Sequence, residues 1–314
     1  MNTIENICYL SQMNSGTPKR LEDMDMNIPY IHVYKDMLGK WDIVGHNYEK
    51  HDNAPRMGLY KYYFKHAVFP NVTGDISGYY NIELHDSYTY LNKPRKIYDN
   101  VLTFAKLKDH KKPIMIPDPY MVVSWNNQVI NDEIKWVDKK DDVCFYGTTT
   151  GNRDPSKNRR INMCLWSLKK PNYNFKITNV AQMSEVDIIS KIGYTNWNSI
   201  YQRQHVPIKD QLFNKFQFLP DGNTCKFDTW YFNTNTLNFK DKSMDMLWYY
   251  PLMMDKTHYV EVCEYTIDQM RQYYINNPKE ACHIIENAKN LYKTLFKPQN
   301  HMYYTSLLFE SMAS

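Results

Sequence analysis

Short apolar runs alternate with helix-length amphipathic stretches in the second half of the chain. The runs contain β-branched and aromatic residues and end at polar turns, which predicts strands. They lie at 143–146, 175–178, 216–219 and 237–240. Apolar residues recur at helical spacing over 161–168 and 281–295, and these stripes predict helices that pack on a sheet. Strands that alternate with helices in this way predict βαβ units and the α/β class.

The clearest strand in the first half of the chain lies at 80–84. Even-numbered residues there are apolar and odd-numbered residues are polar, so the strand is expected to bury one face. Asp86 closes this segment. Ligands of open α/β sheets bind at the carboxyl ends of strands, which makes Asp86 a candidate site residue, although an aspartate that only begins a turn fits the same position. His85 is a second candidate, with a surface or core histidine as its alternative.

Two further segments complete the predicted first domain. A buried strand is expected at 114–116, before a proline-stiffened loop that ends at Trp125. A helix at 302–312 is expected to return to this domain, and charged and polar residues at 135–142 mark its boundary. The predicted domains are 1–138, joined by the C-terminal helix 300–314, and 139–299.

The stretch 143–155 links a strand to a helix through a loop of small residues. Asp154 is expected to cap the helix, with Pro155 at its first position. A loop that leaves backbone N–H groups free before a basic helix N-terminus can bind phosphate. An ordinary turn between a strand and a helix has the same features, so both interpretations stay open at this point.

Composition and charge narrow the classes of function. The 314 residues are 43% hydrophobic and 15% aromatic, values of a globular protein large enough for two domains. The net charge is +4, and 38 basic residues are dispersed among 34 acidic ones. A dedicated nucleic-acid protein usually concentrates its basic residues, so we expect no nucleic-acid partner.

The sequence carries no clear sign of a metal, an oxidising compartment or a membrane. Its cysteines are widely spread, and several lie in apolar patterns that suit reduced, buried thiols. The triplet Asp23-Met24-Asp25 has the form of a manganese site, but a solvated loop is the favoured interpretation in its polar surroundings. Because we find neither a signal peptide nor an apolar run of membrane-spanning length, we expect a cytoplasmic protein without a metal or a transmembrane segment.

Several segments share motifs with one enzyme family. Phe-Tyr-Gly-Thr at 145–148 and Arg-Asp-Pro at 153–155 are similar to the Phe-Arg-Gly-Ser and Arg-Asp-Pro motifs of glycosyltransferase family 90. This family comprises the Rumi-like protein O-glucosyltransferases and the fungal capsule xylosyltransferases. The aromatic run at 248–252 with His-Tyr at 258–259, and Asn-Pro-Lys-Glu-Ala at 277–281, resemble later motifs of the family.

The resemblance runs with gaps from about Tyr79 to about Leu308 and implies roles on the acceptor side. Asn-Ile-Glu-Leu-His-Asp at 81–86 is similar to the strand end Asn-Val-Arg-Asp of the family, which implies that Asp86 is the catalytic base. Trp125 corresponds to a tryptophan beside the acceptor site, with simple packing as the alternative.

The donor contacts that the resemblance implies lie in the second predicted domain. They are Gly147, Thr148, Thr149, Arg153 and Lys226. Lys226 follows Asp-Gly-Asn at 221–223 and stands near the place of an arginine that touches the nucleotide diphosphate in the family. A lysine supplies the charge but not the bidentate fork. Tyr146 stands where the family has another arginine.

The resemblance implies a GT-B-like α/β fold, with two αβ domains facing each other across a cleft. It also implies an inverting, metal-independent transfer of glucose or xylose from a UDP-sugar to a hydroxyl of a protein or glycan. The UDP-sugar would be the donor substrate, and no other cofactor is expected. Because two arginines of the family are replaced in this sequence, a catalytically inactive sugar- or protein-binding module on the same scaffold is the alternative.

Overall fold

The computed structural model divides the chain into two compact units. The described residues are 28–49, 54–82, 84, 101–107, 114–118, 130–223 and 229–313. Unit 1 comprises Met1–Gln128, Met244–Leu252 and Thr294–Ser314, and unit 2 comprises Val129–Ser243 and Met253–Lys293. The domain boundary predicted at residue 138, and the roles assigned to either side of it, stay predictions.

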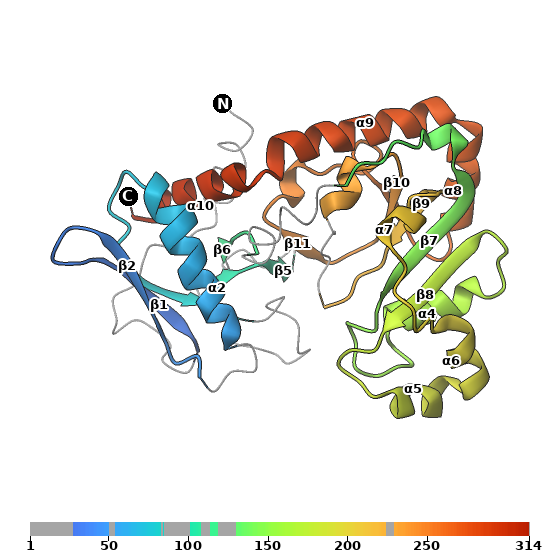
Figure 1. Cartoon of the computed structure of the whole chain (residues 1–314), viewed down its shortest axis with the longest axis horizontal. Coiled ribbons are helices and arrows are strands. Elements are labelled where there is room, and N and C mark those ends of the chain that lie inside the picture. Colours follow the sequence, from blue (N-terminus) through green and yellow to red (C-terminus); the bar gives the residue numbers. More distant parts are fainter. Residues whose placement is uncertain are drawn as a thin grey trace. The chain divides into compact units, whose positions relative to one another are not determined.

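Unit 2 is built on a five-stranded sheet with the order β12-β10-β9-β7-β8 (Figure 1). Its strands are β7 (Lys140–Thr148), β8 (Tyr173–Asn179), β9 (Asn214–Leu219), β10 (Leu237–Asp241) and β12 (Val260–Val262). Every neighbouring pair of these strands is parallel. The strands predicted in the second half of the chain are confirmed, because each predicted run lies within one of β7 to β10. The α/β class is confirmed for this unit.

Helices alternate with the strands of unit 2. They are α4 (Arg159–Ser167), α5 (Glu185–Ile192), α6 (Tyr194–Ile200), α7 (Ile208–Gln211), α8 (Ile267–Asn276) and α9 (Pro278–Leu295), with short 3-10 helices at Trp136–Asp138 and Thr229–Asn233. On α4 the predicted apolar stripe is buried at Ile161 and Cys164, but Leu168 just beyond the helix is exposed. The apolar stripe predicted on α9 is buried along its length.

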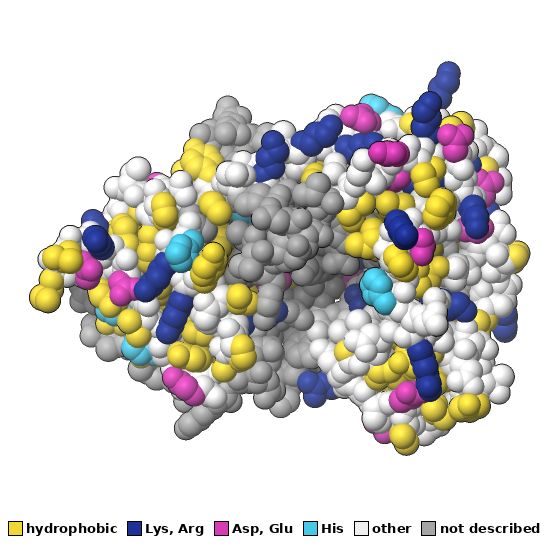
Figure 2. Space-filling model, in the orientation of Figure 1, with side chains coloured by type: hydrophobic (Ala, Val, Ile, Leu, Met, Phe, Trp, Pro, Cys, Tyr) yellow, Lys and Arg dark blue, Asp and Glu magenta, His cyan; other side chains and the backbone are white. Residues whose placement is uncertain are grey.

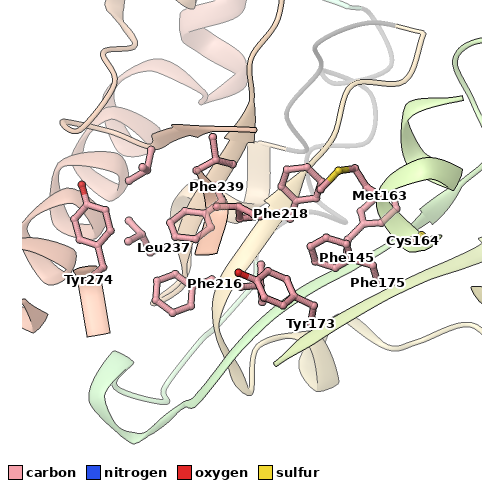
Figure 3. Packing of buried hydrophobic residues seen from close by; sticks show 14 of the residues in the cluster. Phe145, Met163, Cys164, Tyr173, Phe175, Phe216, Phe218, Leu237, Phe239 and Tyr274 are labelled. Carbon is pink, nitrogen blue, oxygen red and sulfur yellow. The ribbon is translucent and has the colours of Figure 1, made fainter. Parts of the chain in front are cut away.

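Aromatic rings fill the core of unit 2. Figure 3 shows a cluster of Phe145, Phe175, Phe216, Phe218 and Phe239, which come from β7, β8, β9 and β10. Phe175 and Phe218 stack with their ring centroids 5.1 Å apart, and Phe145 meets Phe175 edge to face at 6.2 Å. Such pairs add about 0.5–1.5 kcal/mol beyond the burial of their area. This packing holds β7 beside β9 and so fixes where their carboxyl-terminal loops begin.

Unit 1 contains a mixed five-stranded sheet with the order β2-β1-β3-β4-β6. Its strands are β1 (Tyr30–Lys35), β2 (Trp41–His46), β3 (Gly78–Ile82), β4 (Val101–Thr103) and β6 (Ile114–Met115). β1 pairs antiparallel with β2 and β3, whereas β4 pairs parallel with β3 and β6. A two-stranded antiparallel sheet joins β5 (Ala105–Leu107) to β11 (Asp245–Leu247). The strands predicted at 80–84 and 114–116 correspond to β3 and β6.

Two of the helices that the structure describes pack within unit 1. α2 (Pro55–Tyr63) continues into a π turn at Phe64–Val68 and a 3-10 turn at Phe69–Asn71, and α10 (Pro298–Ala313) contains the helix predicted at 302–312. A further 3-10 turn lies at Tyr250–Leu252. The Tyr304 hydroxyl donates to the Met115 carbonyl oxygen at 2.8 Å, and the Phe309 ring lies 4.9 Å from that of Tyr80. α10 therefore contacts both β3 and β6.

The surface in view mixes charges of both signs. Figure 2 shows basic and acidic side chains interspersed over the described residues on this face. The dispersed charge of the sequence therefore extends to this part of the folded surface. Among the helices that the structure describes, none combines the length and the apolar character that a bilayer span requires.

Candidate functional site

The winding of the unit 2 sheet changes direction between β7 and β9. β8 lies on one side of β7, and β9, β10 and β12 follow in sequence on the other side. In open α/β sheets the connections diverge at such a switch point and leave a crevice at the carboxyl ends of the strands, where ligands bind. The loop after β7, at 149–158, and the turn after β9, at 220–223, border this position.

Two glycines bring the loop and the turn into contact. Gly151 has a φ of +123°, and a Cβ at this position would lie 3.4 Å from the carbonyl oxygen of Gly222. The N–H of Gly151 donates to Asn223 Oδ1 at 2.9 Å. The glycine loop and the Asp-Gly-Asn turn at 221–223, which lie far apart in the sequence, therefore belong to one site.

Arg160 crosses between the loop and the turn. Its Nη1 donates to Thr150 Oγ1 at 2.7 Å and to the Thr148 carbonyl oxygen at 3.2 Å. Its guanidinium lies against Gly222, where an added Cβ would be only 2.6 Å from Nη2. The Phe145 ring supports the guanidinium, with 5.8 Å between the ring centroid and Cζ. The predicted site residues did not include Arg160, and its place in the first turn after the loop is the sequence signal that could have identified it.

Asn158 caps α4 and ties the helix to the loop. Its Oδ1 accepts hydrogen bonds from the N–H groups of Arg160 and Ile161, both at 3.1 Å. Its Nδ2 donates to the carbonyl oxygens of Thr149 at 2.9 Å and Asn152 at 2.8 Å. Because the side chain is fully buried, this one asparagine fixes both the start of the helix and the path of the loop.

The prediction that Asp154 caps this helix is wrong. The Asp154 carbonyl oxygen accepts from the N–H of Lys157 at 3.0 Å, and its carboxylate accepts from the N–H of Ser156 at 3.0 Å. Asp154 and Pro155 therefore form a turn that precedes the helix. Aspartate and proline favour the first positions of turns and of helices alike, so the local sequence did not separate the two structures.

The loop offers hydrogen-bond donors that no described residue accepts. The backbone N–H groups of Thr150, Asn152 and Arg153 make no hydrogen bond within the described chain. The Arg153 side chain is exposed and likewise has no partner among these residues. The hydroxyls of Thr148 and Thr150 lie 3.2 Å apart beside these groups. Successive free N–H groups in a turn form a site for an anion.

Gly147 and Thr149, both predicted donor contacts, shape the loop. A Cβ at Gly147 would lie 2.7 Å from the Phe145 ring, so only glycine fits beneath that ring. Thr149 Oγ1 donates to the Ala181 carbonyl oxygen and accepts from the Ala181 N–H, both at 2.8 Å. A ligand could reach the Thr149 hydroxyl only by breaking this pair.

Carboxylates at the ends of β9, β10 and β12 have cationic partners. Lys240 donates to Asp221, and Arg159 donates to both oxygens of Asp241 at 2.7 Å and to Glu264 at 2.8 Å. The hydrogen bond from Arg159 lowers the pKa of Glu264. These pairs reduce the repulsion that an anion would meet at this end of the sheet. They also engage Arg159 with two carboxylates.

Tyr146 is directed away from the crevice. Its hydroxyl hydrogen-bonds with the Asn174 amide, and Asn174 pairs in register with Cys144, nearer the start of β7. Burial is the largest cause of the raised pKa of Tyr146, which reaches about 12. The tyrosine therefore brings neither a charge nor a hydroxyl to the carboxyl end of β7.

Some predicted residues have no described position. Asp86, Trp125 and Lys226 lie outside the described residues, as do His85, Asp23 and Asp25. Their roles stay predictions. The described residue before Asp86 is Leu84, whose carbonyl oxygen accepts a hydrogen bond from Arg56 Nη1 at 2.6 Å.

Comparisons with known proteins add little to this geometry. No protein-family model matches the chain, and a search of curated proteins finds no match. Among solved structures, the chain is similar to the C-terminal domain of a glycosyl transferase group 1 family protein (LpcC) from Francisella tularensis. The match has 12% identity and a TM-score of 0.32, and it covers 58% of this chain and 96% of that domain. At this TM-score the similarity carries no conclusion about the fold or function of this chain.

Proposed function

We propose that unit 2 binds the diphosphate of a nucleotide-sugar at the switch point and that the protein is a glycosyltransferase. The observation that carries the proposal is the group of free N–H donors at Thr150, Asn152 and Arg153, at the carboxyl end of β7. The Thr148 and Thr150 hydroxyls and the Arg160 guanidinium lie beside them. Donors fixed in this way stabilise the charge of a leaving diphosphate without reorganisation during the reaction.

The donor in this proposal is a UDP-sugar, as the resemblance to family 90 implies. Arg153 and Lys226 would add positive charge to the N–H groups, and each charge-assisted hydrogen bond contributes roughly 1.5–3 kcal/mol. Gly147 and Thr149 would act by holding the loop, since the Thr149 hydroxyl already bonds to Ala181. Positive side chains and N–H donors would carry the leaving diphosphate in this mechanism.

On the acceptor side, Asp86 would act as the general base. It would take the proton from an acceptor hydroxyl as that oxygen attacks the anomeric carbon on the face opposite UDP, and the product would be inverted at this carbon. A positioned base of this kind contributes roughly 10²- to 10⁴-fold to the rate. Trp125 would contact the acceptor, a protein or glycan hydroxyl, and glucose or xylose would be transferred across a GT-B-like cleft.

The first test is binding of UDP by calorimetry to the full chain. Replacing Arg160 by glutamine should weaken UDP binding roughly 10- to 100-fold, because a charge-assisted contact is lost. Arg203→Gln is the matched control, since Arg203 is largely exposed and lies outside the loop and the turn, 3.6 Å from Glu185 and 5.9 Å from the Tyr201 ring centroid. Equal UDP affinity in the parent and in Arg160→Gln would contradict the assignment of the site.

The second test separates an enzyme from a binding module. Asp86→Asn should keep its affinity for UDP but lose most of its sugar transfer and most of the slow hydrolysis of the donor. Both reactions are followed by mass spectrometry of released UDP. Unchanged turnover in Asp86→Asn would exclude Asp86 as the base. UDP binding with neither transfer nor hydrolysis in the parent would support the inactive binding module instead.

A further inference from the structure

A cavity of about 590 Å³ lies on unit 2 where α8, α9 and the turn before β12 meet. Its floor is apolar and aromatic: Tyr274 and Ile284 are 2% and 3% exposed. Met270 packs against the same core. The volume falls within the range of roughly 300–1,000 Å³ that is typical of small-molecule sites.

This cavity is at the opposite end of the sheet from the switch point. The turn at 254–258 leads into β12 at Val260 and therefore lies at the amino end of that strand. α8 starts beyond the carboxyl end of β12 and lines the cavity from Gln269 to Tyr274, together with the start of α9. The loops after β7 and β9 lie at the carboxyl ends of strands parallel to β12. A ligand in the cavity would thus be separate from the proposed diphosphate site.

Two lysines on the wall of the cavity have no anionic partner in the described part of the chain. Lys256 and Lys279 form no ion pair or side-chain hydrogen bond with any described residue. The carboxylate of Glu280, also on the wall, accepts from the Tyr273 hydroxyl at 2.9 Å. Asp255 beside Lys256 accepts from the N–H of Glu261 at 2.7 Å. Glu280 is therefore bonded to a hydroxyl of the same wall and Asp255 to a backbone N–H, and neither carboxylate is paired with these ammonium groups.

The backbone that carries Lys256 is held in an unusual conformation. Lys256 has a φ of +57°, a region that a lysine rarely adopts. Its N–H donates to the Tyr259 carbonyl oxygen at 2.7 Å. The His258 N–H donates to the Met254 carbonyl oxygen at 3.0 Å. The N–H of Met254 in turn donates to His258 Nδ1 at 3.2 Å. These bonds fix the base of the lysine side chain at the edge of the cavity.

We propose that this cavity binds a small organic anion with a flat apolar body, such as an aromatic carboxylate, sulfonate or phosphate. The ring system would lie on Tyr274 and Ile284, and the anionic group would contact Lys256 and Lys279. Apolar burial and ion pairing would then act on the two ends of one molecule. This assignment does not depend on the proposed transferase function.

The test uses anilinonaphthalene sulfonate as the probe, titrated by fluorescence into the full chain. Phenylnaphthylamine, which has the same rings without the sulfonate, is titrated in parallel. Changing Lys256 and Lys279 together to glutamine should weaken binding of the sulfonate roughly tenfold or more and leave the neutral amine unchanged. The matched control changes Lys169 and Lys209, exposed lysines of unit 2 outside the cavity, to glutamine.

A second variant tests the cavity itself. Gln269 is exposed on the wall, so Gln269→Trp should fill the space without disturbing the core and should weaken both probes. Retention of sulfonate affinity in the double lysine variant, or of both affinities in Gln269→Trp, would overturn the proposal. Displacement of the sulfonate by UDP would also overturn it, because the probe would then report on the switch point. A protein that binds the sulfonate at this cavity but not UDP would refute only the transferase proposal.

Discussion

Arg160 and Gly222 lie so close together that a methyl group added at Gly222 would clash with the Arg160 guanidinium. The guanidinium reaches across the crevice from α4, and Thr150 accepts its hydrogen bond on the other side at 2.7 Å. The contact joins residues that are far apart in the sequence, which is why a motif scan finds the Asp-Gly-Asn turn but not the arginine that meets it. The side chains that complete such a site are brought together only by the fold, so the local sequence does not identify them. The glycines, in contrast, can be recognised from the local sequence.

The change Gly222→Ala tests this contact. The new Cβ would lie 2.6 Å from Arg160 Nη2 and 2.8 Å from Thr150 Oγ1, so the guanidinium or the loop must shift. We expect UDP affinity to fall roughly 10-fold, with a loss of about 1–3 kcal/mol in the free energy of unfolding. Calorimetry and urea unfolding measure the two effects. Gly58→Ala is the control: nothing lies within 4 Å of its Cβ, and in the interior of α2 it should raise the free energy of unfolding by about 0.5–1 kcal/mol.

At the scale of elements, the sequence predicted the strands of unit 2 well and one helix start poorly. Apolar runs predict these strands reliably because strands in the interior of the unit need apolar residues on their buried faces. The predicted runs lie inside β8, β9 and β10. Local residue types left the start of α4 ambiguous, because Asp154-Pro155 suits a turn as well as a cap. Asn158 is the cap because its amide also donates hydrogen bonds to the carbonyl oxygens of Thr149 and Asn152. These contacts depend on the folded loop.

The pair Asn158→Ala and Asp154→Ala distinguishes the two possible caps. Asn158→Ala removes the cap and the two hydrogen bonds that the side-chain amide donates to the loop, which should lower the free energy of unfolding by about 2–4 kcal/mol. It should also weaken UDP binding, because the loop loses its anchor. Asp154→Ala removes only bonds within an exposed turn and should cost less than about 1 kcal/mol. Urea unfolding checks both values. A larger loss from Asp154→Ala than from Asn158→Ala would indicate that Asp154 is the cap.

At the scale of the whole molecule, the order of the chain does not follow the division into units. Met244–Leu252 belongs to unit 1 although the segments on either side belong to unit 2. Its strand β11 pairs with β5, and Trp248 packs on Tyr304 of α10 with 4.6 Å between ring centroids. No local period signals such a return, so the sequence could not predict it. Unit 1 is thus completed only when the last helix of the chain is in place.

His301, on that last helix, is expected to make the stability of the protein depend on pH. The side chain is fully buried, its ring 5.0 Å from that of Trp248, and burial lowers the pKa of His301 to about 3 from 6.5. Between these values the unfolded chain binds a proton that the folded chain does not. The contribution of the neutral His301 to the free energy of unfolding is therefore fully present above pH 6.5. It is lost as the pH decreases, by up to about 1.4 kcal/mol per pH unit.

The measurement is urea unfolding of the parent and of His301→Leu between pH 4 and pH 7.5. Other titrating groups contribute to both proteins and cancel in the difference between the two curves. The leucine variant binds no proton at this position, so its free energy of unfolding should fall less steeply below about pH 6.5, whatever the cost of the replacement at neutral pH. Parallel curves would show that His301 is solvated or protonated in the folded state. In that case the packing of α10 against Trp248 would not be as tight as its burial indicates.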